Sequence, residues 1–235
     1  MMNCADADAS EKTMEALRGR HSVRQYVDKP LPANVLEALG AEAEACNRAA
    51  DLHIQLIANE PQAFAGAMAR YGKFSGVANY FALVGKKAPD LDERFGYYGE
   101  RLAIRAQELG LNTCWVALTF SKGKCAARVD AGEKLGLVIA LGYGATQGGP
   151  RPSKPMEALC ALGATTPDWF KAGMEAAMLA PTAMNQQKFF LELADAAAEP
   201  PVVRAKPIGG FYSKVDLGIV KYHFEVGAGR PVAWR

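Results

Sequence analysis

The run RHSVRQY occupies residues 20–26 and follows Gly19, which ends a predicted helix. It places two guanidinium groups, an imidazole and a hydroxyl within residues 20–24. Arginine offers planar, forked donors, and serine and histidine add single hydrogen bonds at short range. Such a cluster suits a doubly charged phosphate group.

A second unusual run, APTAMNQQ, occupies residues 180–187 between an apolar predicted helix and an apolar predicted strand. Its carboxamide side chains carry both donors and acceptors, so they can read the edge of a flat heterocycle. Together the two runs suggest a protein that holds a phosphorylated aromatic cofactor.

Composition excludes several classes of protein. The 235 residues are 50% hydrophobic and 22% charged, with a net charge of +2, which is ordinary for a globular protein and argues against a nucleic-acid surface. No apolar run approaches the ~20 residues needed to span a bilayer. Residues 1–12 are polar and lack an apolar leader segment, so we expect a disordered lead-in to a cytoplasmic protein.

Cysteine and histidine usage points to neither disulfides nor metal. The five cysteines are odd in number and form no CxxC pair, which is typical of reduced thiols. The three histidines are far apart and show no metal-ligand spacing. We therefore interpret His53 and His223 as structural.

Helical and strand patterns alternate along the chain. Helices are predicted over residues 13–18, 32–50, 61–69, 91–109, 167–179 and 213–226. Strands are predicted over residues 52–58, 80–85, 112–120, 135–143 and 188–193, with an edge strand at 231–235. Thr166 is a predicted cap before Pro167 at the first helical position, and Ser213 with Asp216 resembles a capping box.

A weak internal repeat runs through this order. It predicts a first half over residues 13–160 and a shorter second half over 161–235, built together as one compact unit. In the repeat, residues 45–50 correspond to residues 181–187. Coincidence between two alanine-rich helices is the alternative.

Three motifs resemble those of the FMN-dependent nitroreductases. Residues 20–26 are similar to the RxSxRxF signature of that family. Residues 110–116, GLNTCWV, resemble its GLGTCW segment, and residues 180–187 resemble its APSSxNxQPW segment, with Lys188-Phe189 in place of Pro-Trp. The resemblance implies an α+β sandwich with a central, mostly antiparallel sheet and helices on both faces.

The resemblance also implies four groups of cofactor contacts. The phosphate and part of the ribityl chain are expected on Arg20, His21, Ser22 and Arg24, with Arg151 or Lys154 completing this group. One side of the flavin is expected on Pro181, Thr182, Ala183 and Asn185, with Gln187 in support. The backbone N–H groups of Leu118 and Thr119 are expected to face N5 and O4 of the flavin. The side chains of Arg70 and Lys73 are expected to contact its N1/O2 edge.

The order of the motifs departs from the usual family, in which the Asn/Gln segment follows the Arg/Ser segment by a few dozen residues. In that family a homodimer holds each flavin between subunits. The two half-repeats of this chain are therefore expected to imitate the dimer and to form one composite FMN site per chain. A monomer could then bind flavin, and a homodimer stays open.

The expected function is oxidoreduction with FMN, in which NAD(P)H is a transient co-substrate and the acceptor is a nitroaromatic, a quinone or a similar small molecule. No catalytic side chain is required, because the chemistry belongs to the cofactor. Two alternatives stay open: a flavin-binding module without turnover, and a decayed structural or interaction scaffold.

Single residues also have plainer interpretations. Cys114 and Trp115 are interpreted as core residues. Arg70 and Lys73, taken without the motifs, are interpreted as surface charges on an amphipathic helix.

Overall fold

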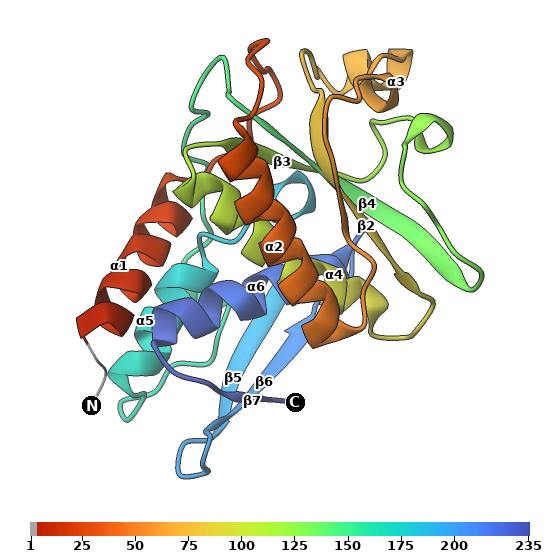
Figure 1. Cartoon of the computed structure of the whole chain (residues 1–235). Helices are drawn as coiled ribbons and strands as arrows, with labels where there is room; N and C mark the ends of the chain where they lie inside the picture. The colour runs from red at the N-terminus through yellow and green to blue at the C-terminus, as the bar shows by residue number, and fades with distance from the viewer. Residues whose placement is uncertain (1–3) are drawn as a thin grey trace. The chain divides into compact units, whose positions relative to one another are not determined.

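The computed structural model describes residues 4–235, with side chains described from residue 11 onward (Figure 1). The chain divides into two compact units. Unit 1 comprises Met1–Arg18, Asp92–Glu100 and Arg151–Arg235, and unit 2 comprises Gly19–Leu91 and Arg101–Pro150. This division does not follow the expected halves 13–160 and 161–235, since residues 1–18 and 92–100 group with the C-terminal part.

Unit 2 is built on a four-stranded antiparallel sheet with the strand order β1-β2-β4-β3. Its strands are β1 (Gln55–Ile57), β2 (Asn79–Lys86), β3 (Asn112–Val116) and β4 (Glu133–Gly142). In register, Tyr80 of β2 pairs with Ala140 of β4. The central strands β2 and β4 contain the nearly continuous apolar runs, and most of their residues are buried, as expected of strands covered on both faces.

Unit 2 contains several helical segments and, on one face of its sheet, an aromatic core. The helical segments are α2 (Ala33–Ala50), η1 (Gln62–Phe64), α3 (Ala67–Tyr71), η2 (Lys122–Lys124) and the second half of α4 (Leu91–Glu108). The ring of Phe64 lies 5.4 Å from that of Phe74, 5.9 Å from Tyr80 and 6.2 Å from Phe120, measured between centroids. This packing fixes the loop that contains Phe74 beside the sheet.

Unit 1 contains a three-stranded sheet with the order β5-β6-β7. Strands β5 (Phe189–Asp195) and β6 (Val202–Pro207) are antiparallel, and β7 (Ala233–Trp234) lies parallel to β6. Helices α5 (Asp168–Ala177) and α6 (Ser213–Ala228) pack against each other, side by side in Figure 1. The unit also holds α1 (Cys4–Gly19) up to Arg18 and the short helices η3 (Met156–Ala158) and η4 (Ala183–Asn185).

Residues 92–100 of α4 cross α6 at very close range. A Cβ atom on Gly96 would lie 2.0 Å from the carbonyl oxygen of Val215, and one on Gly218 would lie 2.0 Å from that of Glu93. Glycine is therefore required at positions 96 and 218 so that the two helix backbones can come into contact. In the same two helices, Nε2 of His223 lies 2.9 Å from Oε1 of Glu100, and both side chains are fully buried.

Three sequence expectations about elements differ from the structure. We expected a disordered lead-in over residues 1–12; residues 1–3 lie outside the described residues, whereas residues 4–12 belong to α1, which begins at Cys4, because its alanine, glutamate and lysine residues favour helix. Strand β6 was not predicted, since its apolar signal is only Val202-Val203 before charged residues. The strands also form two sheets rather than one central sheet.

Helix starts were predicted less well than helix positions. Pro32 and Pro167 each precede the first helical residue instead of occupying it. Thr166 accepts a hydrogen bond from the backbone of Gly163, 2.8 Å away, and does not cap α5. The capping box at Ser213 is also wrong, because α6 begins after Tyr212 without a side-chain cap and Asp216 binds elsewhere.

Among the helices of the described residues, none is both long enough and apolar enough to cross a membrane.

Candidate functional site

The arginine-rich run is held in unit 2 by backbone hydrogen bonds. Val23 donates to the carbonyl of Thr113 in β3, at 3.0 Å, and Tyr26 donates to Ser75, also at 3.0 Å. The hydroxyl of Tyr26 donates to the carbonyl of Val23 at 2.7 Å. The run therefore lies between the start of β3 and the loop before β2, and the buried side chains of Val23 and Tyr26 hold it there.

The polar side chains of this run lie close to one another. Arg20 is buried, whereas Ser22 and Arg24 are exposed. All three act on the thiol of Cys114: burial raises its pKa, while the charges of Arg24 and Arg20 and a hydrogen bond with Ser22 lower it. Two cations and a hydroxyl thus converge on one place at the edge of the sheet, the donor set expected for a phosphate.

A pocket of about 390 Å³ opens beside this cluster. It combines two cationic side chains, three aromatic rings and a stretch of backbone that follows β3. Its lining residues are Arg24, Tyr71, Gly72, Lys73, Phe74, Trp115, Val116, Ala117 and Thr119. The guanidinium of Arg24 lies 5.9 Å from the ring centroid of Phe74, which is within cation–π range.

Three residues predicted from the sequence line this pocket together, namely Arg24, Lys73 and Thr119. Arg70 and Leu118 do not line the pocket; both are exposed and are adjacent in sequence to residues that do. Trp115, which we interpreted as core, is half-buried and lines the pocket. Sequence reasoning missed Tyr71 and Phe74; an aromatic residue on each side of Lys73 was the available signal.

The Asn/Gln segment lies in unit 1, at the end of α5. Its backbone is unusual, because Met184, Asn185 and Gln187 all have positive φ angles, of 52°, 55° and 46°. Such left-handed residues are uncommon outside glycine and cost free energy unless neighbouring contacts hold them. The side chain of Met184 is 97% exposed, so the segment presents an apolar tip to its surroundings.

Carboxamides of this segment hold the loop 151–154. Asn185 donates through Nδ2 to the carbonyl of Pro152 at 2.9 Å, and Gln187 donates through Nε2 to the same carbonyl at 3.2 Å. Oε1 of Gln187 accepts from the backbone of Lys154 at 2.8 Å. Arg151, a predicted phosphate ligand, donates to the carbonyls of Met178 and Ala180.

The predicted site residues thus fall into two sets. Unit 2 contains Arg20, His21, Ser22, Arg24, Arg70, Lys73, Leu118 and Thr119, and unit 1 contains Arg151, Pro181, Thr182, Ala183, Asn185 and Gln187.

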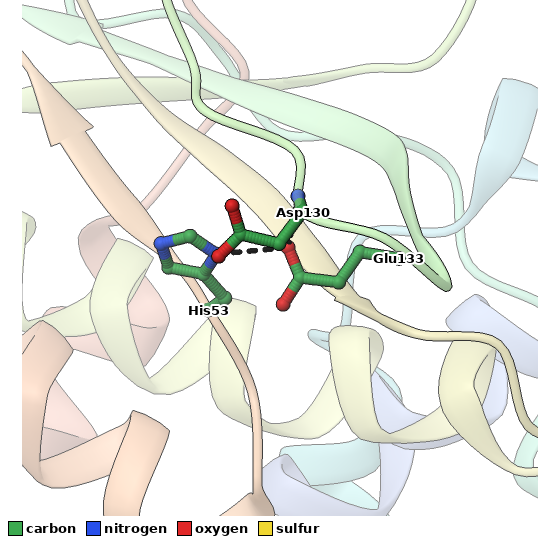
Figure 2. A group of neighbouring side chains, drawn as sticks. All are labelled: His53, Asp130 and Glu133. Atoms are coloured by element: carbon green, nitrogen blue, oxygen red, sulfur yellow. Dashed lines mark hydrogen bonds and ion pairs between the residues drawn. The ribbon is translucent and has the colours of Figure 1, made fainter.

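A third polar cluster in unit 2 consists of His53, Asp130 and Glu133 (Figure 2). Nδ1 of His53 lies 2.9 Å from Oε2 of Glu133, and the backbone N–H of Asp130 donates to the same oxygen at 2.8 Å. Burial opposes the ionisation of Glu133, but the hydrogen bonds from His53 and Asp130 bring its pKa below the ordinary value. Arg128 pairs with Asp130 at 2.7 Å, so a protein cation already compensates the acidic charge.

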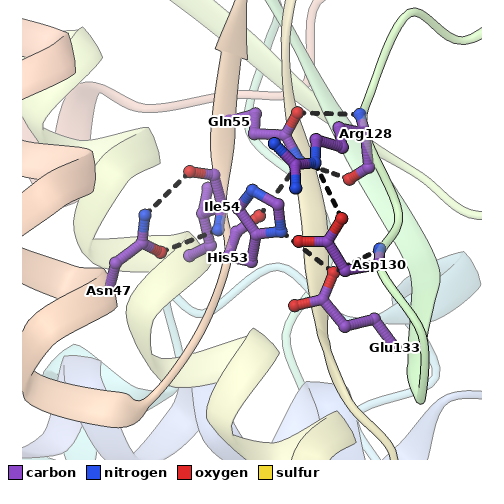
Figure 3. A network of polar contacts seen from close by, with 7 residues as sticks. All are labelled: Asn47, His53, Ile54, Gln55, Arg128, Asp130 and Glu133. Carbon is purple, nitrogen blue, oxygen red and sulfur yellow. Dashed lines mark hydrogen bonds and ion pairs between the residues drawn. The ribbon is translucent and has the colours of Figure 1, made fainter.

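Figure 3 shows that this cluster belongs to a longer network along β1. Gln55 accepts from the backbone N–H of Arg128 at 2.9 Å and donates to its carbonyl at 2.7 Å. Asn47 of α2 donates to the carbonyl of Ile54 at 2.9 Å and accepts from its N–H at 2.7 Å. These contacts tie Ile54 and Gln55, at the start of β1, to α2 on one side and to the segment around Arg128 on the other.

Residues 12–228 match the family described as "Putative TM nitroreductase". No curated protein matches the chain. Among solved structures, a "putative nitroreductase" from Thermotoga maritima has a TM-score of 0.63 at 19% identity, covering 92% of this chain and 82% of that one. A "putative nitroreductase in complex with FMN" from Desulfovibrio desulfuricans has a TM-score of 0.52 at 18% identity, covering 66% of this chain and 98% of that one.

A "nitroreductase-like protein" from Streptococcus mutans has a TM-score of 0.54 at 13% identity, with 65% of this chain and 98% of that one covered. At these identities the structures establish a common fold, and the expected α+β nitroreductase-like fold is confirmed. Since the family match spans most of the residues, the chain belongs to this nitroreductase family.

Proposed function

We propose that the chain is an FMN-dependent oxidoreductase that takes electrons from NAD(P)H and passes them to a nitroaromatic, a quinone or a similar small acceptor. Family membership supports the general class of oxidoreductase. The observation that carries the assignment of FMN is the pocket beside residues 20–26, in which cationic and aromatic side chains converge. Flavin supplies the hydride and electron transfer when bound.

The donor set of the pocket fits the cofactor. Arg24 and Ser22 are exposed and can bind a phosphate, and Arg20 adds charge behind them. Lys73 lines the same pocket, where a cation would favour the negative charge of the reduced ring. The rings of Tyr71 and Trp115 provide flat apolar surface for an aromatic ligand.

The remaining site residues are proposed from the sequence motifs. We assign one side of the flavin to Pro181, Thr182, Ala183, Asn185 and Gln187, the backbone contacts to Leu118 and Thr119, and auxiliary contacts to His21, Arg70 and Arg151. All four cysteines whose side chains are described are free thiols, which supports a cytoplasmic location. The proposal allows a monomer and a homodimer.

The first test replaces a phosphate ligand. Arg24→Ala is expected to weaken FMN binding by about 1.5–3 kcal/mol, the range for hydrogen bonds to charged groups. Riboflavin lacks the phosphate, so its affinity should hardly change. Arg128→Ala is the matched control, because Arg128 is exposed and pairs with Asp130 instead. Equal losses for FMN and riboflavin would refute the phosphate assignment.

The second test separates an enzyme from the two alternatives. The FMN-loaded protein is mixed with NADH or NADPH without oxygen, and the flavin absorbance near ~450 nm is followed. Bleaching, followed by recovery of the colour on adding a quinone or nitroaromatic, supports turnover. Bound flavin that does not bleach indicates a binding module, and failure to bind flavin indicates a scaffold.

A further inference from the structure

Asp216 lies in the first turn of α6, where its carboxylate is almost fully buried, with 3% of the residue exposed. Oδ1 accepts a hydrogen bond from the backbone N–H of Ala183 at 2.9 Å. Oδ2 accepts a hydrogen bond from Nε2 of Gln186 at 2.7 Å. Both donors belong to segment 183–187, which contains the positive-φ residues Met184, Asn185 and Gln187, so one carboxylate holds this segment at two points.

The amide of Gln186 has a defined orientation. Its Nε2 donates to Asp216 and also to the carbonyl oxygen of Phe211, at 2.8 Å. Rotating the amide by half a turn would place its oxygen against two acceptors. The segment therefore requires an acceptor at position 216, and a carboxamide there would set one N–H group against another.

Other side-chain contacts hold the segment from Asn185 onward, beginning with the donation from Asn185 to the carbonyl of Pro152 at 2.9 Å. The ammonium group of Lys154 donates to the carbonyls of Gln186 and Gln187, at 3.0 Å and 2.9 Å. The hydroxyl of Thr182 accepts from the backbone of Gln187 at 3.0 Å. Asp216 is thus the side chain that the structure places on the Ala183 end, just before the strained Met184 and Asn185.

The carboxylate at this position is costly for folding. Burial raises the pKa of Asp216 to about 6, although the hydrogen bonds from Gln186 and Ala183 oppose this shift. At neutral pH the buried group is ionised even though burial disfavours its charge. A strained backbone held by a buried carboxylate is more typical of a functional site than of a contact that serves packing alone.

We propose that Asp216 is a positioning residue, which holds segment 183–187 in the conformation, with positive φ at Met184, Asn185 and Gln187, that presents its backbone and Asn185 to the flavin. The inference rests on the proposed function, in which this segment contacts one side of FMN. Asp216 acts through Ala183 and Gln186 and is not itself a catalytic residue.

Asp216→Asn tests this proposal, with Asp168→Asn as the matched control. Asp168 occupies the first turn of α5 but is exposed and pairs with Lys171. Amide hydrogen exchange of segment 183–187 is measured in the flavin-free protein, because this readout does not depend on FMN. Exchange in the Asp216→Asn protein should be at least ~10-fold faster, as expected when a held segment opens locally.

FMN affinity and the midpoint potential of bound FMN are measured in the same proteins. Asp216→Asn should weaken FMN binding by about 10-fold, or ~1.4 kcal/mol, and shift the potential, whereas Asp168→Asn should change neither. A residue that only stabilised the fold would leave the potential unchanged. If Asp216→Asn does not fold, Gln186→Met removes one of the two hydrogen bonds and should change exchange, affinity and potential in the same direction but to a smaller extent, because the bond from Ala183 remains.

Unchanged exchange would overturn the anchoring of the segment. Faster exchange with unchanged affinity and potential would overturn its positioning role towards flavin, while the proposed function would stand. Failure of the unmodified protein to bind FMN would reject the proposed function itself, and this inference with it.

Discussion

Replacing Glu100 with alanine should strongly destabilise unit 1. Oε1 of Glu100 lies 2.9 Å from Nε2 of His223, and neither side chain is exposed. The other ring nitrogen, Nδ1, lies 3.1 Å from the carbonyl oxygen of Ala176, so Nδ1 carries a hydrogen. The imidazole is therefore fixed between a backbone acceptor and a carboxylate.

Burial of both partners sets the magnitude. Removing one partner of a buried pair that contains a carboxyl group can cost about 3–5 kcal/mol, because the other partner is left unsatisfied in an apolar interior. We expect this loss for Glu100→Ala. Glu100→Gln keeps the volume and leaves a hydrogen-bonding carboxamide opposite Nε2 of His223, so it should cost less than about 1.5 kcal/mol.

Urea unfolding followed by tryptophan fluorescence measures these losses. Trp169 and Trp234 report on this region, because their rings lie 6.3 Å and 5.5 Å from the ring of Phe224, next to His223 in the chain. Glu175→Ala, at an exposed position of α5, is the control and should be close to neutral. A loss below about 1.5 kcal/mol for Glu100→Ala, or equal losses for the alanine and glutamine variants, would refute this reasoning.

Three further predictions concern packing, pH and stoichiometry. Gly96→Ala should destabilise the chain by about 1–3 kcal/mol or more in the same assay, because its Cβ would overlap the carbonyl of Val215, whereas Gly40→Ala meets no atom within 4 Å and should not destabilise. The pKa of Asp216 is raised from 3.8 to about 6, so the folded state binds the proton more tightly. The contribution of Asp216 to stability should then fall as the pH rises from 4 to 6, and a flat difference between the wild type and Asp216→Asn in pH-dependent unfolding would contradict this. Calorimetric titration with light scattering should give one FMN per chain, and two FMN per chain would overturn the composite site expected from the sequence.

Local sequence patterns were sufficient for most elements and for the family. Continuous apolar runs predicted the strands that became β2, β3 and β4, since a strand buried on both faces needs apolar residues at every position. Helices α2, α4, α5 and α6 were located by periodicity and by glycine and proline at their ends. The predicted starts were less accurate: two helices begin one residue later than predicted, and the predicted caps of α5 and α6 do not form. A capping contact depends on backbone geometry that the sequence pattern does not contain.

The candidate site was predicted only where a motif is contiguous. Residues 20–26 and 180–187 stand out in the sequence because several polar groups occur together in each. Tyr71 and Trp115 are separated in the chain and became lining residues of one pocket only through the packing of unit 2. Tyr71 lies close to Lys73 and Trp115 lies within the motif 110–116, but neither signal by itself separates an aromatic residue of a pocket from one of the core.

By itself, then, the sequence determined the secondary structure of the central elements and the resemblance to nitroreductases, and it predicted the polar cluster of residues 20–24 as a phosphate site. Only the tertiary structure decided the partners of Asp216 and Glu100, which lie 33 and 123 residues away in the chain. The physical reason is that period and propensity act over a few neighbouring residues, whereas a buried carboxylate is satisfied by whichever donor the packing brings to it.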